Sequence, residues 1–342
     1  MKTGHPVRLK DIAEELGLSV MAVSKALRSH TDIGEETRRR VQARAAELKY
    51  RPNLLPRQML TGRTRTIGMI VPTLESTYFA QVAHGVTTYL RSNGYNLFLC
   101  NSEASAEEEK NHVESLLAHQ VDGFVLCPAG PLRSRNELAY LLDSGVPCVL
   151  AARGRPPFEA NFAGSDSVAI GRAATEHLLA CGCRRIAHIR GPAVVGAEQR
   201  MEGYRQALRN RGHRSPSASI AGDSDGIEAG YRAMRLLLSR TPRPDGVFCY
   251  TDLTAGGAMK ALLEAGLRVP QDVAIVGVGN LVFSDILRTP LTTIEQDPVR
   301  IGIEAATTVL NLAGAKPKRE LVECLVPFQL IERESSRVSS PR

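Results

Sequence analysis

Tryptophan is absent from this 342-residue sequence, and aromatic residues make up only 5% of it. No segment contains about 18 uninterrupted apolar residues, the length that a membrane-spanning helix requires. The N-terminus also lacks an apolar run followed by a small-residue cleavage site, so a secretory signal is not indicated. We therefore expect a cytoplasmic protein with no membrane segment.

Cysteine is scarce and scattered. The seven cysteines are odd in number, and most lie inside apolar runs, where a free thiol packs like a small hydrophobic side chain. Cys181 and Cys183 stand close together, but no second Cys/His pair follows at the spacing of metal ligands. We therefore expect reduced thiols, as in the cytoplasm, and neither a metal site nor a cofactor.

Acidic residues are too few to balance the charge in the first fifth of the chain. Residues 1–66 contain 14 lysines and arginines against 7 acidic residues, whereas the rest of the chain contains 29 of each. The whole net charge of +7 therefore lies in this head. A basic head on a neutral body is either a solvated helical surface or the footprint of a protein that binds the phosphate backbone of nucleic acid.

The head shows the pattern of three short helices. Apolar residues recur three and four positions apart over residues 9–16, 20–27 and 35–49. Gly17 ends the first segment, and Ser19 can cap the second. Two short helices joined by a glycine turn are typical of the helix-turn-helix unit, whose second helix enters the major groove of DNA.

The first residues of that second helix would face the bases. Lys25 can donate to guanine O6 and N7 or to a phosphate, and Ser24 suits phosphate oxygens. Val20 and Met21 can contact thymine methyl groups. The expected contacts from this helix are Ser19, Val20, Met21, Ala22, Ser24 and Lys25.

From Thr66 onward, strand-like and helical segments alternate. Eight apolar runs predict strands, at residues 66–72, 96–101, 122–128, 147–152, 185–191, 217–223, 245–250 and 273–279. Such alternation predicts parallel sheets covered by helices. The pattern is too long for one sheet and recurs after about residue 166, so we expect two similar lobes.

Residues 9–53 read LKDIAEELGLSVMAVSKALRSHTDIGEETRRRVQARAAELKYRPN. This segment resembles the DNA-binding head of the lac repressor/galactose repressor family of bacterial regulators. The family pattern runs from I-x-D-V-A through G-V-S-x-x-T-V-S-R to T-R-x-x-V and L-x-Y-x-P-N, and Lys25 replaces its usual arginine. The resemblance continues to the end of the body, through the segments IGMIVPTL, VDGFVL, GVPCVL, ATEHLLACGCRRIAHIRGP, RMEGYRQAL, LTTIEQDP and IERESS.

The resemblance implies an all-α helix-turn-helix head and an α/β body like a periplasmic sugar-binding protein, with two Rossmann-like lobes. The expected boundaries are 1–52 for the head, 53–65 for the hinge, 66–335 for the body, 66–164 and 296–323 for its N-lobe, 165–292 and 324–335 for its C-lobe, and 336–342 for a disordered tail. A repressor of this kind is not an enzyme. A small effector between the lobes controls its affinity for an operator.

The resemblance also implies how the protein meets its operator. In the family the hinge becomes a helix on specific DNA, and a leucine from each subunit enters the minor groove. Here Asn53 would cap that helix, and either Met59 or Leu60 would be the wedge. Family members bind pseudo-palindromic operators as twofold dimers. This chain has no C-terminal leucine heptads of the kind that make tetramers, so we expect a homodimer.

Family members hold a sugar or a purine between the lobes. The matching positions here are Tyr78, Phe79, Asp166, Arg200, Ser224, Thr251, Asp252 and Asn280. Arg200 matches the family's effector arginine, and a salt bridge at the lobe edge is the alternative. Asp252 either binds the effector or caps a helix, and Asp166 is more often structural than a ligand.

Two departures concern the effector. Gly279 stands where the family has its sugar-binding aspartate, and Ser224 stands where it often has a stacking aromatic ring. We therefore expect an effector other than a plain pyranose, such as a sugar acid held by Arg200 or a phosphorylated metabolite. An enzyme and a transport-type sugar-binding protein are the alternatives. The first lacks a dinucleotide-binding or P-loop motif here, and the second would not carry a basic head.

Overall fold

The structure is a computed structural model that describes residues 7–27, 30–50, 62–212, 219–314 and 321–337. The chain divides into two compact units, the head (Met1–Thr64) and the body (Arg65–Arg342). Three of the expected DNA contacts, Asn53, Met59 and Leu60, lie outside the described residues.

The described part of the head consists of three helices around a small apolar core. These are α1 (Leu9–Leu16), α2 (Val20–Leu27) and α3 (Glu35–Glu47), as the periodicity predicts. Gly17 follows α1 with a φ of 66°, a left-handed conformation that glycine adopts at little cost, and it turns the chain towards α2. The core contains Ile12, Ala13, Val23, Ala26, Val41 and Ala45.

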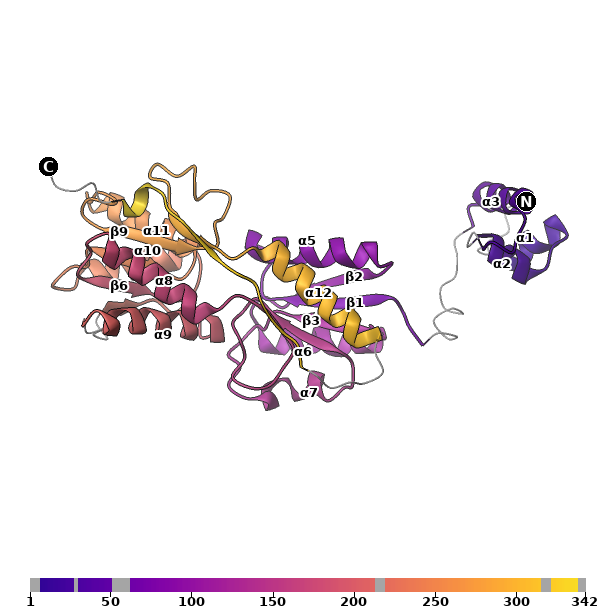
Figure 1. The fold of residues 1–342 in the computed structure, drawn as a ribbon, viewed down its shortest axis with the longest axis horizontal. Coiled ribbons are helices and arrows are strands. Elements are labelled where there is room, and N and C mark those ends of the chain that lie inside the picture. The colour runs from indigo at the N-terminus through magenta and orange to yellow at the C-terminus, as the bar shows by residue number, and fades with distance from the viewer. Residues whose placement is uncertain (1–6, 28–29, 51–61, 213–218, 315–320, 338–342) are drawn as a thin grey trace. The chain divides into compact units, whose positions relative to one another are not determined.

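The body contains two six-stranded sheets, one in each expected lobe (Figure 1). The strands of the N-lobe sheet are β1 (Thr66–Val71), β2 (Asn96–Asn101), β3 (Gly123–Leu126), β4 (Cys148–Ala151), β5 (Phe162–Gly164) and β11 (Glu323–Leu325). They are all parallel, in the order β11-β5-β4-β3-β1-β2. The buried strands read as continuous apolar runs because helices cover both faces.

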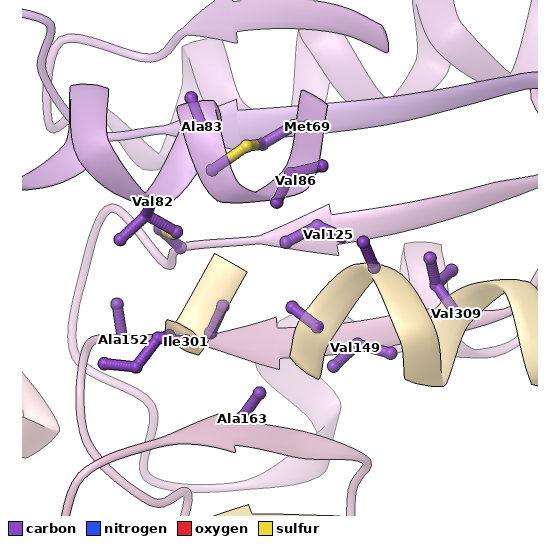
Figure 2. Close-up of a cluster of buried hydrophobic side chains, with 14 of the residues drawn as sticks. Met69, Val82, Ala83, Val86, Val125, Val149, Ala152, Ala163, Ile301 and Val309 are labelled. Atoms are coloured by element: carbon purple, nitrogen blue, oxygen red, sulfur yellow. The ribbon is translucent and has the colours of Figure 1, made fainter. Parts of the chain in front are cut away.

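Helices α5 (Thr77–Ser92) and α12 (Pro298–Gly314) cover one face of the N-lobe sheet. Figure 2 shows their contact with the strands: Val82 and Val86 of α5 and Ile301 of α12 point towards Val125 and Val149. The other face is covered by α6 (Ala106–Ala118), η1 (Arg135–Leu138) and α7 (Ala139–Leu142).

The C-lobe repeats this plan. Its strands are β6 (Ile186–Ile189), β7 (Ile220–Ala221), β8 (Gly246–Cys249), β9 (Ala274–Val278), β10 (Thr292–Glu295) and β12 (Gln329–Ile331), in the order β12-β10-β9-β8-β6-β7. Only β12 is antiparallel among the described pairings. Helices α8 (Ser167–Ala180) and α9 (Val195–Asn210) cover one face, and α10 (Ile227–Leu238) and α11 (Asp252–Glu264) cover the other.

The same packing device recurs in the three helix pairs of the body. Where α5 crosses α12, α8 crosses α9, and α10 crosses α11, a glycine from each helix lies at the contact. A Cβ atom on Gly85, Gly203 or Gly257 would lie 2.1, 2.0 or 1.9 Å from a backbone oxygen of the facing helix. The partner glycines are Gly302, Gly171 and Gly230, and they are equally crowded. The backbones of each pair therefore touch.

The chain passes between the lobes three times, after β5, after β10 and after β11 (Figure 1). The lobe boundaries differ slightly from those expected. Strand β10 extends the C-lobe to Glu295, and β11 keeps residues up to Leu325 in the N-lobe, because each strand pairs with its own sheet.

Two residues of the expected tail, Ser336 and Arg337, belong to the described structure. A short helix, η3 (Glu334–Ser336), ends the described chain, and Ser335 and Ser336 are buried in it. The Ser335 hydroxyl donates to the carbonyl of Ile275 and accepts from the N–H of Thr292, which fixes this segment on the C-lobe sheet.

All seven cysteines are free thiols. Cys127, Cys148 and Cys249 are buried, as their apolar runs predict, and Cys183 is buried as well. None of the helices in the described residues is both long enough and apolar enough to span a bilayer.

Candidate functional site

The turn between α1 and α2 presents an exposed apolar tip. The hydroxyl of Ser19 accepts a hydrogen bond from the N–H of Ala22 at 3.1 Å, so Ser19 caps α2 as expected. Val20 and Met21 follow with 45% and 69% of their surfaces exposed. Large apolar side chains this exposed at the start of a helix are available for an apolar contact in a DNA groove.

Lys25 lies one turn further along α2 and forms an ion pair within the head. Its Nζ lies 2.5 Å from Oδ2 of Asp32, in the loop before α3. The hydrogen bond from Lys25 lowers the pKa of Asp32. Contact between Lys25 and a base therefore requires that the ion pair with Asp32 be broken or that Asp32 move with Lys25.

The arginines of α3 divide into two kinds. Arg38 donates to the carbonyls of His30 and Ile33, and so fixes the loop before its own helix. Arg44 is paired with Glu15 of α1 and Glu47 of α3. Arg39 and Arg40 of α3 are exposed, so their charges are available to DNA phosphates.

The body contains a cavity of about 580 Å³, part of it open to solvent, between the two lobes. In each sheet the strand order changes direction at one strand. In the N-lobe β2 and β3 lie on opposite sides of β1, and in the C-lobe β7 and β8 lie on opposite sides of β6. Ligands of open α/β sheets bind at such switch points, beyond the carboxyl ends of the strands. The cavity is lined by residues that follow both strands, including Ser76, Tyr78 and Phe79 after β1 and Gly196 and Arg200 after β6.

Arg200 projects from α9 into this cavity and is 7% exposed. It donates through Nη1 to the carbonyl of Tyr250 at 2.6 Å and through Nη2 to Oε1 of Gln296 at 3.1 Å. Its guanidinium carbon lies 4.8 Å from the centre of the Tyr250 ring, and this cation–π contact stabilises the charged guanidinium. No carboxylate pairs with this guanidinium among the ion pairs of the described residues.

Three buried polar atoms of the cavity wall have no hydrogen-bond partner in the described structure. They are Oη of Tyr78, Nε of Arg200 and Nε2 of Gln296. Burial also raises the pKa of Tyr78. An unsatisfied buried polar group costs about 1–3 kcal/mol, so a ligand that forms hydrogen bonds with these three atoms gains binding free energy.

The acidic residue of the cavity wall is already engaged. Asp225 accepts hydrogen bonds from the hydroxyl of Thr251 at 2.5 Å and from the N–H of Gly226 at 2.8 Å. Thr251 also caps α11 by accepting from the N–H of Thr254. Asp225 and Thr251 therefore brace each other across the C-lobe side of the cavity.

The lobes touch along a seam beside the cavity. The carbonyl of Arg153 accepts from the N–H of Gly196 at 2.8 Å. The amide of Gln199 exchanges two hydrogen bonds with the backbone of Arg155, at 2.8 and 3.2 Å. We call these four residues the seam; they join the loop after β4 to the first turns of α9.

Four of the eight expected effector residues line the cavity: Tyr78, Phe79, Arg200 and Thr251. The structure gives the other four internal partners. Asp252 is fully buried and accepts from Leu281, Ser284 and Thr293, which fixes the loop after β9.

Asp166 caps α8 by accepting from the N–H of Ala169. Ser224 donates to Asp223, and the Asn280 side chain lies between Glu295 and Arg333. None of the three lines the described cavity.

Two further cavity residues could have been expected from their positions at the ends of predicted strands. Arg153 directly follows the predicted strand at 147–152 and Tyr250 ends the one at 245–250, and ligands of parallel sheets bind at such strand ends. Gln296 lies in a crossing segment, and its place in the wall depends on how the two lobes meet.

Comparison with known proteins decides the family. Residues 8–53 match bacterial regulatory proteins of the lacI family, and residues 175–336 match the periplasmic binding protein-like domain. The HTH-type transcriptional repressor PurR of Haemophilus influenzae is 34% identical over 306 residues, 89% of this chain and 90% of the relative. PurR of Pasteurella multocida is 33% identical over 330 residues, 96% and 98% of the two chains. The chain belongs to the LacI family.

Solved structures agree with this membership. The lac repressor dimer bound to operator and the anti-inducer ONPF has a TM-score of 0.87 and 27% identity, covering 98% of this chain and 100% of that chain. The complex of the transcriptional regulator CelR with cellobiose has a TM-score of 0.73 and 29% identity, covering 96% and 99%. The LacI-family likeness confirms the helical head and the two-sheet α/β body. The protein is a DNA-binding transcriptional repressor rather than an enzyme.

Proposed function

We propose that this repressor binds a pseudo-palindromic operator as a homodimer, and that a carbohydrate-like effector between the lobes controls its operator affinity. The observation that carries the proposal is the cavity at the switch points of both sheets, with three unpartnered buried polar atoms in its wall. A ligand there contacts both lobes at once. Its binding energy therefore depends on how the lobes are arranged, which is the requirement for control of a distant site.

The DNA contacts proposed here are those of the α2 tip. Val20 and Met21 are the exposed apolar residues, and Lys25 is the cation one turn behind them. The positive charge concentrated in residues 1–66 supplies the attraction to phosphates that is independent of sequence.

The proposed effector class rests on the cavity and on the neighbours. The CelR structure is a complex with cellobiose, and the lac repressor structure contains ONPF. Aromatic and aliphatic side chains, among them Phe79, Tyr250, Leu253 and Val278, form the apolar part of the wall, and Arg200, Gln296 and Tyr78 offer hydrogen bonds. This mixture suits a small polar ring with an apolar face.

A salt titration of operator binding tests the regulator function. An operator is first selected from random duplex DNA. The affinity of the protein for this operator is then measured by fluorescence anisotropy between about 50 and 200 mM salt, a range over which binding that depends on phosphate contacts weakens steeply. We expect affinity to fall steeply with salt and to change when an effector binds. Selection that enriches no sequence would reject the proposal.

A further inference from the structure

The charged residues of the cavity wall are not balanced. Arg153 and Arg200 line the cavity from opposite lobes, and Asp225 is the acidic residue among the described lining residues. Asp225 already accepts hydrogen bonds from Thr251 and Gly226. The wall therefore carries one net positive charge, and its carboxylate is engaged elsewhere.

Arg153 was not expected from the sequence, and its surroundings leave its charge available. Its guanidinium carbon lies 5.6 Å from the centre of the Phe79 ring. No hydrogen bond or ion pair of this guanidinium is found within the described part of the chain. The nearby carboxyl of Glu109 accepts from the Ala129 N–H and the Tyr140 hydroxyl instead.

The seam places the two arginines on segments that touch. The carbonyl of Arg153 is bonded to the N–H of Gly196, and Arg200 lies one helical turn beyond Gly196 in α9. Two carboxylates flank Gln296 in sequence, and both have partners. Glu295 accepts from Asn280 and from the N–H of Asp297, and Asp297 accepts from the N–H of Arg300. The unused groups of the wall are therefore donors: the Arg153 guanidinium, Nε of Arg200, Nε2 of Gln296 and the Tyr78 hydroxyl.

We propose that the effector carries an anionic group, a carboxylate or a phosphate, that is held jointly by Arg153 of the N-lobe and Arg200 of the C-lobe. This inference rests on the proposed function, because it names the chemistry of the ligand that the same cavity would bind. Oxygen anions accept several hydrogen bonds at once and form the strongest ones with guanidinium donors. An anion between two arginines from opposite lobes also stabilises the arrangement in which the seam is formed.

Calorimetry and thermal shifts with matched probes test the inference. The anionic probes are D-glucuronate, D-glucose 6-phosphate and inorganic phosphate, and the neutral probes are D-glucose and hypoxanthine, all at one ionic strength. We expect at least one anionic probe to bind the full-length protein about tenfold more tightly than either neutral probe. Glucuronate and glucose 6-phosphate separate a carboxylate from a phosphate.

Two variants test whether Arg153 binds the anionic group. Arg153→Gln should weaken binding of the anionic probe by about tenfold or more, the usual effect of losing a charged hydrogen bond. Arg232→Gln removes an equal charge from the surface of α10, where the guanidinium pairs with Glu228, and should leave that affinity within about twofold.

Several outcomes would overturn the inference: tighter binding of glucose or hypoxanthine than of any anion, an anion affinity that Arg153→Gln does not change, or no stabilisation by any anionic probe. If only a neutral probe binds and changes operator affinity, the proposed function stands and the proposal of an anionic effector is wrong. Failure to bind any selected operator would reject the function whatever the cavity binds.

Discussion

Lys25 is the residue at which the head departs from its family's usual pattern, and its environment shows why the exchange matters. A guanidinium can donate in two directions at once, whereas an ammonium is a compact charge that one carboxylate can neutralise. Asp32 does this in the described head. Base contact by Lys25 therefore competes with an internal ion pair.

Substitution of Lys25 measures its contribution. Lys25→Ala should weaken operator binding by about 1–3 kcal/mol, the range for a base-reading side chain, and should relax the preference at one position of the site. Anisotropy titrations with the selected operator and with single-base variants provide the measurement.

Lys110→Ala is the matched control. It removes the same charge from a lysine that is also paired with a carboxylate, Glu114, but in helix α6 of the body. An equal loss of affinity in both variants would mean that overall charge, and not a specific contact, explains the effect.

His188 is a buried residue outside the cavity whose titration affects folding. It is fully buried, lies 4.6 Å from the Phe248 ring in a stacked arrangement, and its Nδ1 bonds the carbonyl of Phe248 at 2.9 Å. Burial lowers the pKa of His188 to about 4. The unfolded imidazole keeps its ordinary pKa of about 6.5, so the unfolded state binds the proton more readily between these values.

The free energy of unfolding should therefore fall as pH drops from about 6.5 towards 4, by up to about 3 kcal/mol from this residue alone. The raised pKa values of Glu109 and Asp252 act in the opposite direction, so the comparison must be made between variants. Urea unfolding at several pH values should give a shallower dependence for His188→Phe than for the wild type. His119→Phe, at an exposed site, should keep the wild-type slope.

At the residue scale, the sequence identified cavity residues where its positions match those of the family's effector site. Arg200 and Thr251 were found in this way. Asp252 follows the same strand end, yet its carboxylate turns into the protein to hold the loop after β9. Side-chain direction of this kind depends on tertiary contacts, and no sequence spacing encodes it.

Among the elements, the strands that the sequence predicted are those with a continuous apolar run. All eight predicted runs contain a strand. Six of these strands are buried throughout, which requires apolar residues on both faces of a parallel sheet, whereas the edge strands β2 and β7 are partly exposed. The four unpredicted strands, β5, β10, β11 and β12, have three or four residues each. Their pairing is decided by the chain returning to each lobe, which local periodicity does not report.

The glycine contacts between helix pairs make a prediction about stability. Gly257→Ala places a Cβ 1.9 Å from the carbonyl oxygen of Ile227, so α10 and α11 must separate. We expect a loss of about 1–3 kcal/mol in the free energy of unfolding, the usual cost of overpacking. Urea denaturation measures it.

The neighbouring glycine of the same helix is the control. A Cβ on Gly256 would meet only Phe283, at 3.9 Å, among the described atoms. Gly256→Ala should therefore be neutral or stabilise by up to about 1 kcal/mol, since alanine favours a helix. Equal stabilities of the two variants would contradict a close contact of the helix backbones.

At the scale of the whole molecule, the C-lobe exposes apolar side chains that a monomer has no reason to show. Leu263 on α11 is 59% exposed, and Val282 and Ile286 in the loop after β9 are 74% and 78% exposed. Gly256 of α11 faces Phe283 of that loop, so the helix and the loop form one surface. Contiguous apolar surface of this kind marks an interface, and the related lac repressor structure is a dimer.

We expect a second copy of this chain to cover that surface. Sedimentation equilibrium should give twice the chain mass of 37.1 kDa for the wild type, and a shift towards the single mass for Ile286→Asp. Leu236→Asp, on an exposed site of α10, should remain dimeric. A wild-type protein that is monomeric at micromolar concentration would exclude this interface.

The return of the C-terminal segment to both sheets has a consequence for synthesis on the ribosome. Strand β5 ends at Gly164, but α12, which covers the apolar face of the same sheet, begins only at Pro298, after the whole core of the C-lobe. At about 5–20 residues per second, the nascent N-lobe waits roughly 7–27 s for this helix. During that time the part of this face that α12 covers is open to solvent or to a chaperone, so the repressor is most open to aggregation just before α12 emerges.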